Sequence, residues 1–307
     1  MGYNALTDSV LGSLSTAVGT FALQKQNPAT AADMYNSAFG YNAGNKITTG
    51  IRNTLIGAAA GDAITTGIRN STLGYFSGSS LDVGSYNVAI GDNALATDTK
   101  GSTAIAVGYG ALGSQNFSTA TSNYNVAVGY SAGAAVTTGI ENTLVGAFAG
   151  DALTDADRNT ALGLGALGSD TMGSQSTAIG YAALNTQNYT TATNTRNTAV
   201  GYNAGTAVTT GTDNTLIGHE TGDALQTGYQ NTALGHDALG ATVAGINNVA
   251  IGMEAMVSGN AGSNNTIVGK GAGALMTGAN NVALGDLALN KATDPTINIA
   301  IGSSAGS

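Results

Sequence analysis

The sequence predicts an all-β protein, a parallel β-solenoid of about 18 rungs. Three observations lead to this fold class. A motif N-(T/V)-(A/L)-(I/V/L)-G-x-x-A-(L/G) recurs along the whole chain, β-branched residues alternate with small ones inside it, and no 3.6-residue apolar period persists. The period is 17 residues, with three intervals of 21 and one of 16. A short fixed period is typical of stacked, near-identical rungs. The motif closes at Gly2, Gly19, Gly40, Gly57, Gly74, Gly91, Gly108, Gly129, Gly146, Gly163, Gly180, Gly201, Gly218, Gly235, Gly252, Gly269, Gly285 and Gly302.

The first five motif positions predict a short strand, as in Asn53-Thr54-Leu55-Ile56-Gly57. Neighbouring side chains of a strand point to opposite faces, so positions two and four share one face. Because β-branched residues favour buried, pleated surfaces, we expect these two positions in the interior and position three at a seam with another chain. We expect the Asn side chains of position one to form a ladder, and the Gly of position five to bend the chain with a positive φ.

The second half of the motif has two forms. One ends in Ala-Leu, as in Ala94-Leu95, and the other ends in Ala-Gly with an aliphatic residue three positions later, as in Gly61 and Ile64. We interpret them as two ways of filling one core layer.

We expect residues 1–307 to form one continuous domain with three short inserts, near 24–33, 113–122 and 185–194. Each insert begins with Gln-Asn, and the next residue is Pro28, Phe117 or Tyr189. Inserts in a solenoid form loops that protrude on one side.

Composition excludes several classes of protein. The chain has 9 basic and 18 acidic residues, a net charge of −9, and no basic run, which argues against nucleic-acid binding. It has no Cys, which excludes disulfides and thiolate metal sites. The first residues lack the basic and apolar regions of a signal peptide, and no apolar stretch is long enough to cross a membrane.

The repeated N-T-A-(I/V/L)-G-x-x-A resembles the head repeats of trimeric autotransporter adhesins (YadA-like heads) and related repeats of phage tail-fibre and other virion fibre proteins. The resemblance covers essentially the whole chain. It implies a left-handed parallel β-roll, a side-by-side homotrimer and a role in surface attachment. This repeat is longer than the adhesin head repeat, and within residues 1–307 we expect neither the coiled-coil stalk nor the β-barrel anchor of a complete autotransporter.

One column of residues, the position directly after the closing Gly, is rich in Tyr. We expect these residues, with the insert aromatics, to be the candidate contacts for a host glycan, since sugar rings stack on aromatic faces. The alternative, which we favour, is that Tyr packs over the bend or into a seam between chains. The candidate contacts are Tyr41, Tyr75, Tyr109, Tyr130, Tyr181, Tyr202, Phe117 and Tyr189.

His219 and His236 occupy that same column in consecutive rungs. We expect two surface histidines and no metal site, because alternation should turn Glu220 and Asp237 elsewhere. We interpret the Asp of Gly-Asp-Ala (Asp62, Asp151, Asp223) as a turn-stabilising residue. No catalytic or cofactor-binding constellation is apparent, so we expect no enzyme activity and no cofactor.

The sequence therefore predicts a structural and adhesive fibre protein. We expect a rigid trimeric shaft that projects from a virion, as a tail or capsid fibre, and contacts a host surface glycan or protein. Its partners are its own copies and neighbouring fibre or virion proteins at the ends, without nucleic acid and without membrane insertion. The location is the virion surface or the extracellular cell surface. Two alternatives stay open: a bacterial surface adhesin head, and a monomeric ice-binding solenoid with a Thr array.

Overall fold

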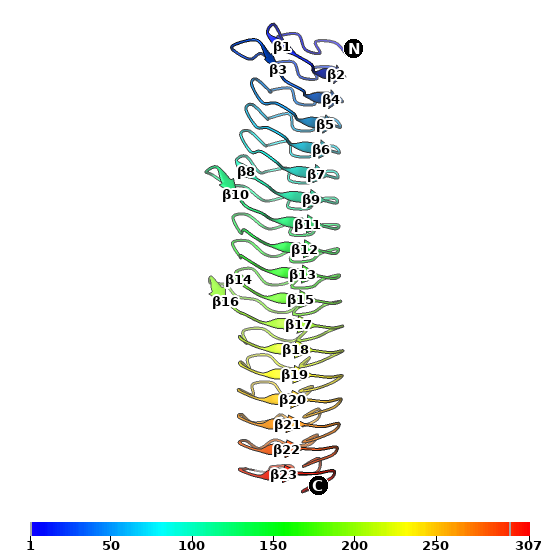
Figure 1. The fold of residues 1–307 in the computed structure, drawn as a ribbon, viewed down its shortest axis with the longest axis vertical. Coiled ribbons are helices and arrows are strands. Elements are labelled where there is room, and N and C mark those ends of the chain that lie inside the picture. Colours follow the sequence, from blue (N-terminus) through cyan, green and yellow to red (C-terminus); the bar gives the residue numbers. More distant parts are fainter. Residues whose placement is uncertain (1, 295) are drawn as a thin grey trace. The chain divides into compact units, whose positions relative to one another are not determined.

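The computed structural model describes residues 2–294 and 296–307, and within these residues it contains strands and turns but no helix. The chain divides into two compact units, Met1–Ala156 and Asp157–Ser307. Each unit is a parallel β-solenoid, in which short strands stack one above the next (Figure 1). The all-β solenoid prediction is confirmed, and the single continuous domain stays a prediction.

The first unit is built on eight three-residue strands. They are β2 (Thr16–Val18), β4 (Ser37–Phe39), β5 (Thr54–Ile56), β6 (Ser71–Leu73), β7 (Val88–Ile90), β9 (Ile105–Val107), β11 (Val126–Val128) and β12 (Thr143–Val145). Four shorter strands accompany them: β1 (Gly12–Ser13), β3 (Ala32–Asp33), β8 (Gly101–Ser102) and β10 (Thr121–Ser122).

The second unit repeats the plan with nine three-residue strands. They are β13 (Thr160–Leu162), β15 (Thr177–Ile179), β17 (Thr198–Val200), β18 (Thr215–Ile217), β19 (Thr232–Leu234), β20 (Val249–Ile251), β21 (Thr266–Val268), β22 (Val282–Leu284) and β23 (Ile299–Ile301). Two shorter strands are β14 (Gly173–Ser174) and β16 (Thr193–Asn194).

Within each unit the strands pair in parallel, with each motif position above its equivalent. Ile56 of β5 lies opposite Leu73 of β6, and Thr215 of β18 lies opposite Thr232 of β19. The described residues thus contain 17 three-residue strands, eight and nine in the two units, against the 18 rungs predicted. The remaining motif copy closes at Gly2, and Met1 before it lies outside the described residues.

The two faces of the strand are the reverse of the prediction. The middle residue of nearly every three-residue strand is fully buried, as Leu55 and Ala199 are, whereas the residues on either side are exposed or half-exposed. Positions two and four therefore point outward, and positions one and three point inward. The prediction was wrong because it placed the β-branched residues inside on their strand preference alone. The Asn of position one makes its hydrogen bonds inside, and this puts positions two and four outside.

The position-one Asn side chains form a buried ladder that explains this orientation. Asn53 and Asn70 each donate their backbone N–H to the Oδ1 of the Asn one rung earlier, at 2.9 Å in both rungs. Their Nδ2 groups donate to the carbonyl oxygens of Gly67 and Gly84, at 3.0 and 2.8 Å. In the second unit Asn214 repeats both contacts at 2.9 Å. Each buried amide is thus satisfied, as an interior position requires.

The interior confirms that the two motif forms fill one layer in different ways. A Cβ on Gly61 would lie 2.8 Å from both Leu55 Cδ2 and Ile64 Cδ1, so Gly leaves room for the large residue at position three. Where position three is Ala, as Ala89 is, a Leu such as Leu95 takes the space in some rungs. In others, leucines of the neighbouring rungs fill it: a Cβ on Gly44 would lie 2.6 Å from Leu55 Cδ1 and 2.9 Å from Leu23 Cδ2.

The three inserts interrupt the Asn ladder and repair it. In the rungs before them position one is Ser15, Ala104 or Ser176 in place of Asn. A Gln from each insert then accepts from the next Asn: Asn36 Nδ2 donates to Gln26 Oε1 at 2.9 Å, and the same contact joins Asn125 to Gln115 and Asn197 to Gln187. The chain after each Gln leads to a two-residue strand, β3, β10 or β16, on the side away from the main strands (Figure 1).

A buried carboxylate holds two of the three inserts. Asp98 accepts from the backbone N–H of Gly101 at 2.9 Å and from Gln115 Nε2 at 2.6 Å. Asp170 makes the equivalent contacts with Gly173 and Gln187, at 3.0 and 2.5 Å. The first insert has Ser9 at the equivalent position, and the Nε2 of its buried Gln26 has no hydrogen-bond partner.

Replacing Ser9 with Asp is therefore expected to stabilise the first insert. The new carboxylate can accept from Gln26 Nε2 as Asp98 accepts from Gln115. This gives the buried Nε2 donor a partner, and an unsatisfied buried donor costs about 1–3 kcal/mol of stability. Amide hydrogen exchange of residues 9–36 should slow relative to the wild type. The matched control is Ser9→Ala, for which no slowing is expected. The reciprocal Asp98→Ser should speed exchange around the second insert, and unchanged exchange in both variants contradicts the assignment.

Candidate functional site

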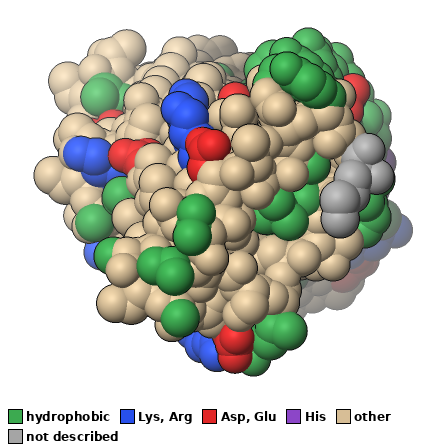
Figure 2. Space-filling view, turned by 90° about the horizontal axis from the view of Figure 1, so that it is seen from above, with side chains coloured by type: hydrophobic (Ala, Val, Ile, Leu, Met, Phe, Trp, Pro, Cys, Tyr) green, Lys and Arg blue, Asp and Glu red, His purple; other side chains and the backbone are tan. Residues whose placement is uncertain are grey.

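In residues 2–294 and 296–307 the structure has no pocket, and its outer faces carry the side chains that can contact a partner. Seen along the stack from the first rungs, charged side chains are scattered among uncharged ones (Figure 2).

The outward residues of position four form an unbroken apolar row in each unit, aliphatic except for Phe39 and here called the aliphatic strip. Several of its members are more than a third exposed: 47% of Leu73, 38% of Ile90 and 37% of Ile217 are accessible. The strip comprises Val18, Phe39, Ile56, Leu73, Ile90, Val107, Val128 and Val145 in the first unit, and Leu162, Ile179, Val200, Ile217, Leu234, Ile251, Val268, Leu284 and Ile301 in the second. The position-two column beside it contains Thr, Ser, Val and Ile and no charged residue.

In many rungs, charged and aromatic side chains occupy the position directly before the ladder Asn, at one end of the strand. In the first unit the Arg52 guanidinium lies 6.0 Å from the centre of the Tyr35 ring, and Arg69 lies 5.2 Å from Tyr86. In the second unit Arg196 Nε contacts Asp213 Oδ1 at 2.6 Å, and this hydrogen bond lowers the pKa of the Asp213 carboxyl. An apolar patch with a polar rim is typical of protein interaction surfaces.

The Tyr column borders the strands on the other side, after the closing Gly. In the first unit the rings of Tyr109 and Tyr130 stack at 5.2 Å and 11°. In the second unit Tyr181 and Tyr202 stack at 5.1 Å, and the column continues through His219 to His236 at the same spacing. These rings cover one another's faces, so they expose mainly their edges.

The remaining predicted contacts of this column, Tyr41 and Tyr75, are about half exposed. Their ring neighbours are Phe21 and Phe76, and both pairs meet edge to face, at 6.1 and 4.3 Å. All six Tyr of the prediction therefore lie at the surface. Their role in binding a glycan stays a prediction.

The two insert aromatics do not belong to this surface. Phe117 is 5% exposed and Tyr189 8%, so the expectation that they present rings to a glycan is wrong. The Tyr189 hydroxyl donates to the carbonyl oxygen of Gly211 at 2.8 Å, and burial raises the pKa of this phenol. The rings are buried because the insert folds back over the core, and an aromatic residue after Gln-Asn was compatible with either a buried or an exposed ring.

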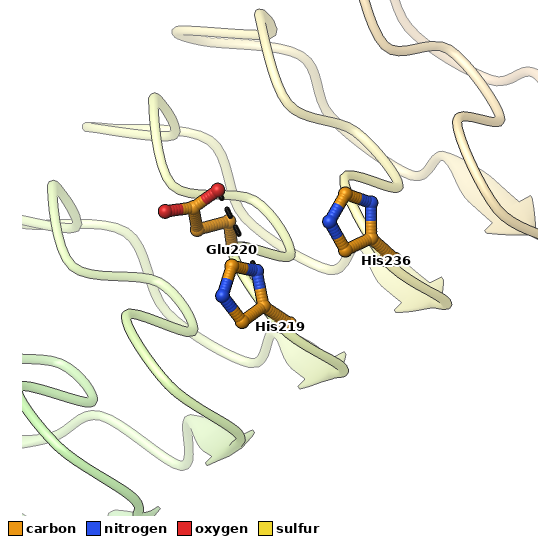
Figure 3. A group of neighbouring side chains, drawn as sticks. All are labelled: His219, Glu220 and His236. Atoms are coloured by element: carbon orange, nitrogen blue, oxygen red, sulfur yellow. Dashed lines mark ion pairs between the residues drawn. The ribbon is translucent and has the colours of Figure 1, made fainter.

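Glu220 lies beside the histidine of its own rung, contrary to the expectation from strand alternation. Its Oε2 is 3.5 Å from His219 Nδ1 (Figure 3). Alternation fails here because Glu220 has a left-handed backbone, with a φ of 54°, and is part of a turn. One rung later, Asp237 Oδ2 lies 3.2 Å from His236 Nδ1 in the same way.

The three Asp residues of Gly-Asp-Ala are partly buried, and this burial raises the pKa of each carboxyl. At Asp223 the nearby Asp237 and Glu220 raise the pKa further, whereas at Asp62 the Lys46 ammonium opposes the shift. The second unit thus has an anionic region around the two histidines.

No protein-family model and no curated protein matches the sequence. In the part of the chain that the structure describes, no helix has the length and apolar character to cross a membrane.

Proposed function

We propose that the chain is a structural and adhesive fibre protein, in which three copies pack side by side through their aliphatic strips. The trimer forms a rigid shaft that projects from a virion, as a tail or capsid fibre, and contacts the host surface. Neighbouring fibre or virion proteins join its ends. The observation that supports the proposal is the unbroken row of outward apolar side chains, exposed or partly exposed, one on each three-residue strand.

Burial of the strip supplies a driving force of the right size. Fully burying an aliphatic side chain stabilises by about 1.5–3 kcal/mol, so covering the exposed two-fifths gives about 0.6–1.2 kcal/mol per strip residue. The six strip residues of the first unit that are at least 36% exposed then contribute about 4–7 kcal/mol per chain, a value within the range of about 4–15 kcal/mol that association costs. The nine residues of the second unit add a similar amount.

The chemistry of the strip fits an identical partner. Its residues recur at the spacing of stacked strands, about 4.8 Å. A second copy offers the same spacing, and closed symmetric assemblies of identical chains are the common solution. Because positions two and four lack charged residues, parallel copies meet without like-charge repulsion.

The first measurement is the native mass by light scattering, with and without boiling in detergent. The chain is 30.0 kDa, so a trimer has a mass of 3 × 30.0 = 90 kDa. We expect Ile90→Lys combined with Ile217→Lys to give a folded monomer, because each unpaired charge in a buried seam costs about 3–5 kcal/mol.

The matched control for these variants is Val83→Lys. Val83 lies outside the strands and is 36% exposed, close to the 38% of Ile90, so the control adds a charge at equal exposure away from the strip. It should remain trimeric. A wild-type monomer, or a trimer that persists in the strip variant, refutes the assembly.

A bacterial surface adhesin head would use the same trimer, and antibody labelling of virions and of cells separates the two locations. The ice-binding alternative has one observation in its favour: in the second unit five consecutive Thr of position two, Thr160, Thr177, Thr198, Thr215 and Thr232, point outward. Aliphatic residues flank this row at every rung, and a trimer would cover it. Thermal hysteresis in a monomeric protein would favour this alternative, whereas its absence in a trimer removes it.

A further inference from the structure

Two consecutive rungs of the second unit bring two histidines and a carboxylate together. His219 follows β18 and His236 follows β19, and their rings stack at 5.1 Å and 11°. Figure 3 shows both rings on the same side of the rungs, with the Glu220 carboxylate next to His219. An imidazole nitrogen of each His and a carboxylate oxygen of Glu220 all lie within 4.8 Å of one another.

We propose that His219, His236 and Glu220 bind one divalent late transition metal ion, for which Zn²⁺ is the probe. Bonds of about 2.0 Å in a tetrahedral site place ligand atoms about 3.3 Å apart. The 3.5 Å between His219 Nδ1 and Glu220 Oε2 already approaches this value. Both His side chains are 49% exposed, so the small rotation that closes the remaining distances meets no packed core.

The electrostatic surroundings select a cation rather than an anion. Besides Glu220, the carboxylates of Asp223 and Asp237 lie near this site, and Glu254 lies one rung further along. Asp237 Oδ2 lies 3.2 Å from His236 Nδ1, Asp223 interacts with both Glu220 and Asp237, and Glu254 occupies the same turn position as Asp237 one rung later. Imidazole ligands favour Zn²⁺, Ni²⁺ and Cu²⁺ over Ca²⁺ or Mg²⁺, which prefer oxygen.

The solenoid provides fold-neutral substitutions for each ligand. Tyr181 and Tyr202 occupy the His column in the two preceding rungs, so His219→Tyr and His236→Tyr keep the ring stack and remove a ligand. Asn203 has the left-handed backbone of Glu220, with a φ of 53° against 54°, so Glu220→Asn keeps the turn. The matched control is Glu254→Asn, which removes the same charge from the same column outside the ligand set.

The test is calorimetric titration of the full-length protein with Zn²⁺ at neutral pH. We expect one ion per chain and at least about tenfold weaker binding in each of the three ligand variants, the lower limit seen when residues that support a metal site are lost. Glu254→Asn should bind with nearly wild-type affinity. Cu²⁺ should show nitrogen hyperfine coupling in the wild type and lose it in the double His variant.

Other results overturn the site. Wild-type binding no tighter than that of the double His variant excludes histidine ligation. An equal loss of Zn²⁺ affinity in Glu220→Asn and Glu254→Asn would mean that Glu220 acts only by general electrostatic attraction. An unchanged affinity in Glu220→Asn would mean that its carboxylate is not a ligand. One ion per three chains contradicts a site contained in one chain.

Discussion

Replacing Gly57 with Ala is expected to disrupt the stack of rungs in the first unit. Gly57 has a φ of +132°, which residues with a Cβ rarely adopt. An added Cβ would overlap the carbonyl oxygen of Gly74 in the next rung and lie 2.7 Å from its carbonyl carbon. Both obstacles are backbone atoms that cannot move without shifting a whole rung. We expect a loss of about 4 kcal/mol or more, at the severe end for single substitutions.

Gly110→Ala is the matched control, since Gly110 also has a positive φ, of +62°. Its added Cβ would meet only Ser131 Oγ, at 3.8 Å, and Ala59 and Ala182 already have left-handed backbones in other rungs. The cost should be about 1–2 kcal/mol, the price of a left-handed backbone alone. Thermal melting and amide exchange measure both variants. Similar losses of stability in the two variants would show that the positive φ, rather than the contact with the next rung, sets the cost of replacing Gly57.

Replacing Asn70 with Ala is expected to have the second largest effect. The side chain accepts from the backbone N–H of Asn87 at 3.0 Å and donates to the carbonyl oxygen of Gly84 at 2.8 Å. Both partners are buried, and each unsatisfied group costs about 1–3 kcal/mol. We therefore expect a loss of about 3–5 kcal/mol, with fast amide exchange at Asn87.

Asn93→Ala is the control for this substitution, because Asn93 lies in a half-exposed turn outside the ladder. A loss of at most about 1–2 kcal/mol is expected there, the cost of placing Ala in the left-handed backbone of Asn93, with a φ of 58°. The natural Ala104 shows why context decides the effect: its insert supplies Gln115 and Asn123, which contact Asn125 at 2.9 and 3.0 Å. If Asn70→Ala were as mild as Asn93→Ala, the ladder would contribute little to stability.

The repeat was enough to predict the solenoid, the bend at the closing Gly and the common core layer. Each of them depends on a residue type that recurs at the same motif position in rung after rung. It was not enough to orient the strand. Thr54 and Ile56 favour a pleated surface whichever side it faces. The deciding residue was Asn53, whose side-chain amide accepts from the backbone N–H of Asn70 and donates to the carbonyl oxygen of Gly67 inside the stack.

The candidate site was predicted less well than the fold. Alternation could not place Glu220, because left-handed backbones recur in the turns at residues such as Arg52, Phe148 and Glu220 whose types do not signal them. The sequence did place His219 and His236 together, since one period separates them. It could not show that Phe117 and Tyr189 are buried, because an aromatic residue in an insert can either pack against the core or face a partner.

Each insert and the residues that restore the Asn ladder around it form one local unit of the sequence. The compensating changes, Ala104 in the rung, Asp98 one turn before the insert and Gln115 within it, all lie within a single period of the insert. Rungs beyond that period keep the Asn ladder, as Asn70 and Asn142 do. A solenoid of this kind can therefore gain, lose or move a side loop by a local exchange of residues, and it can lengthen by whole periods, without changes in the rest of the chain.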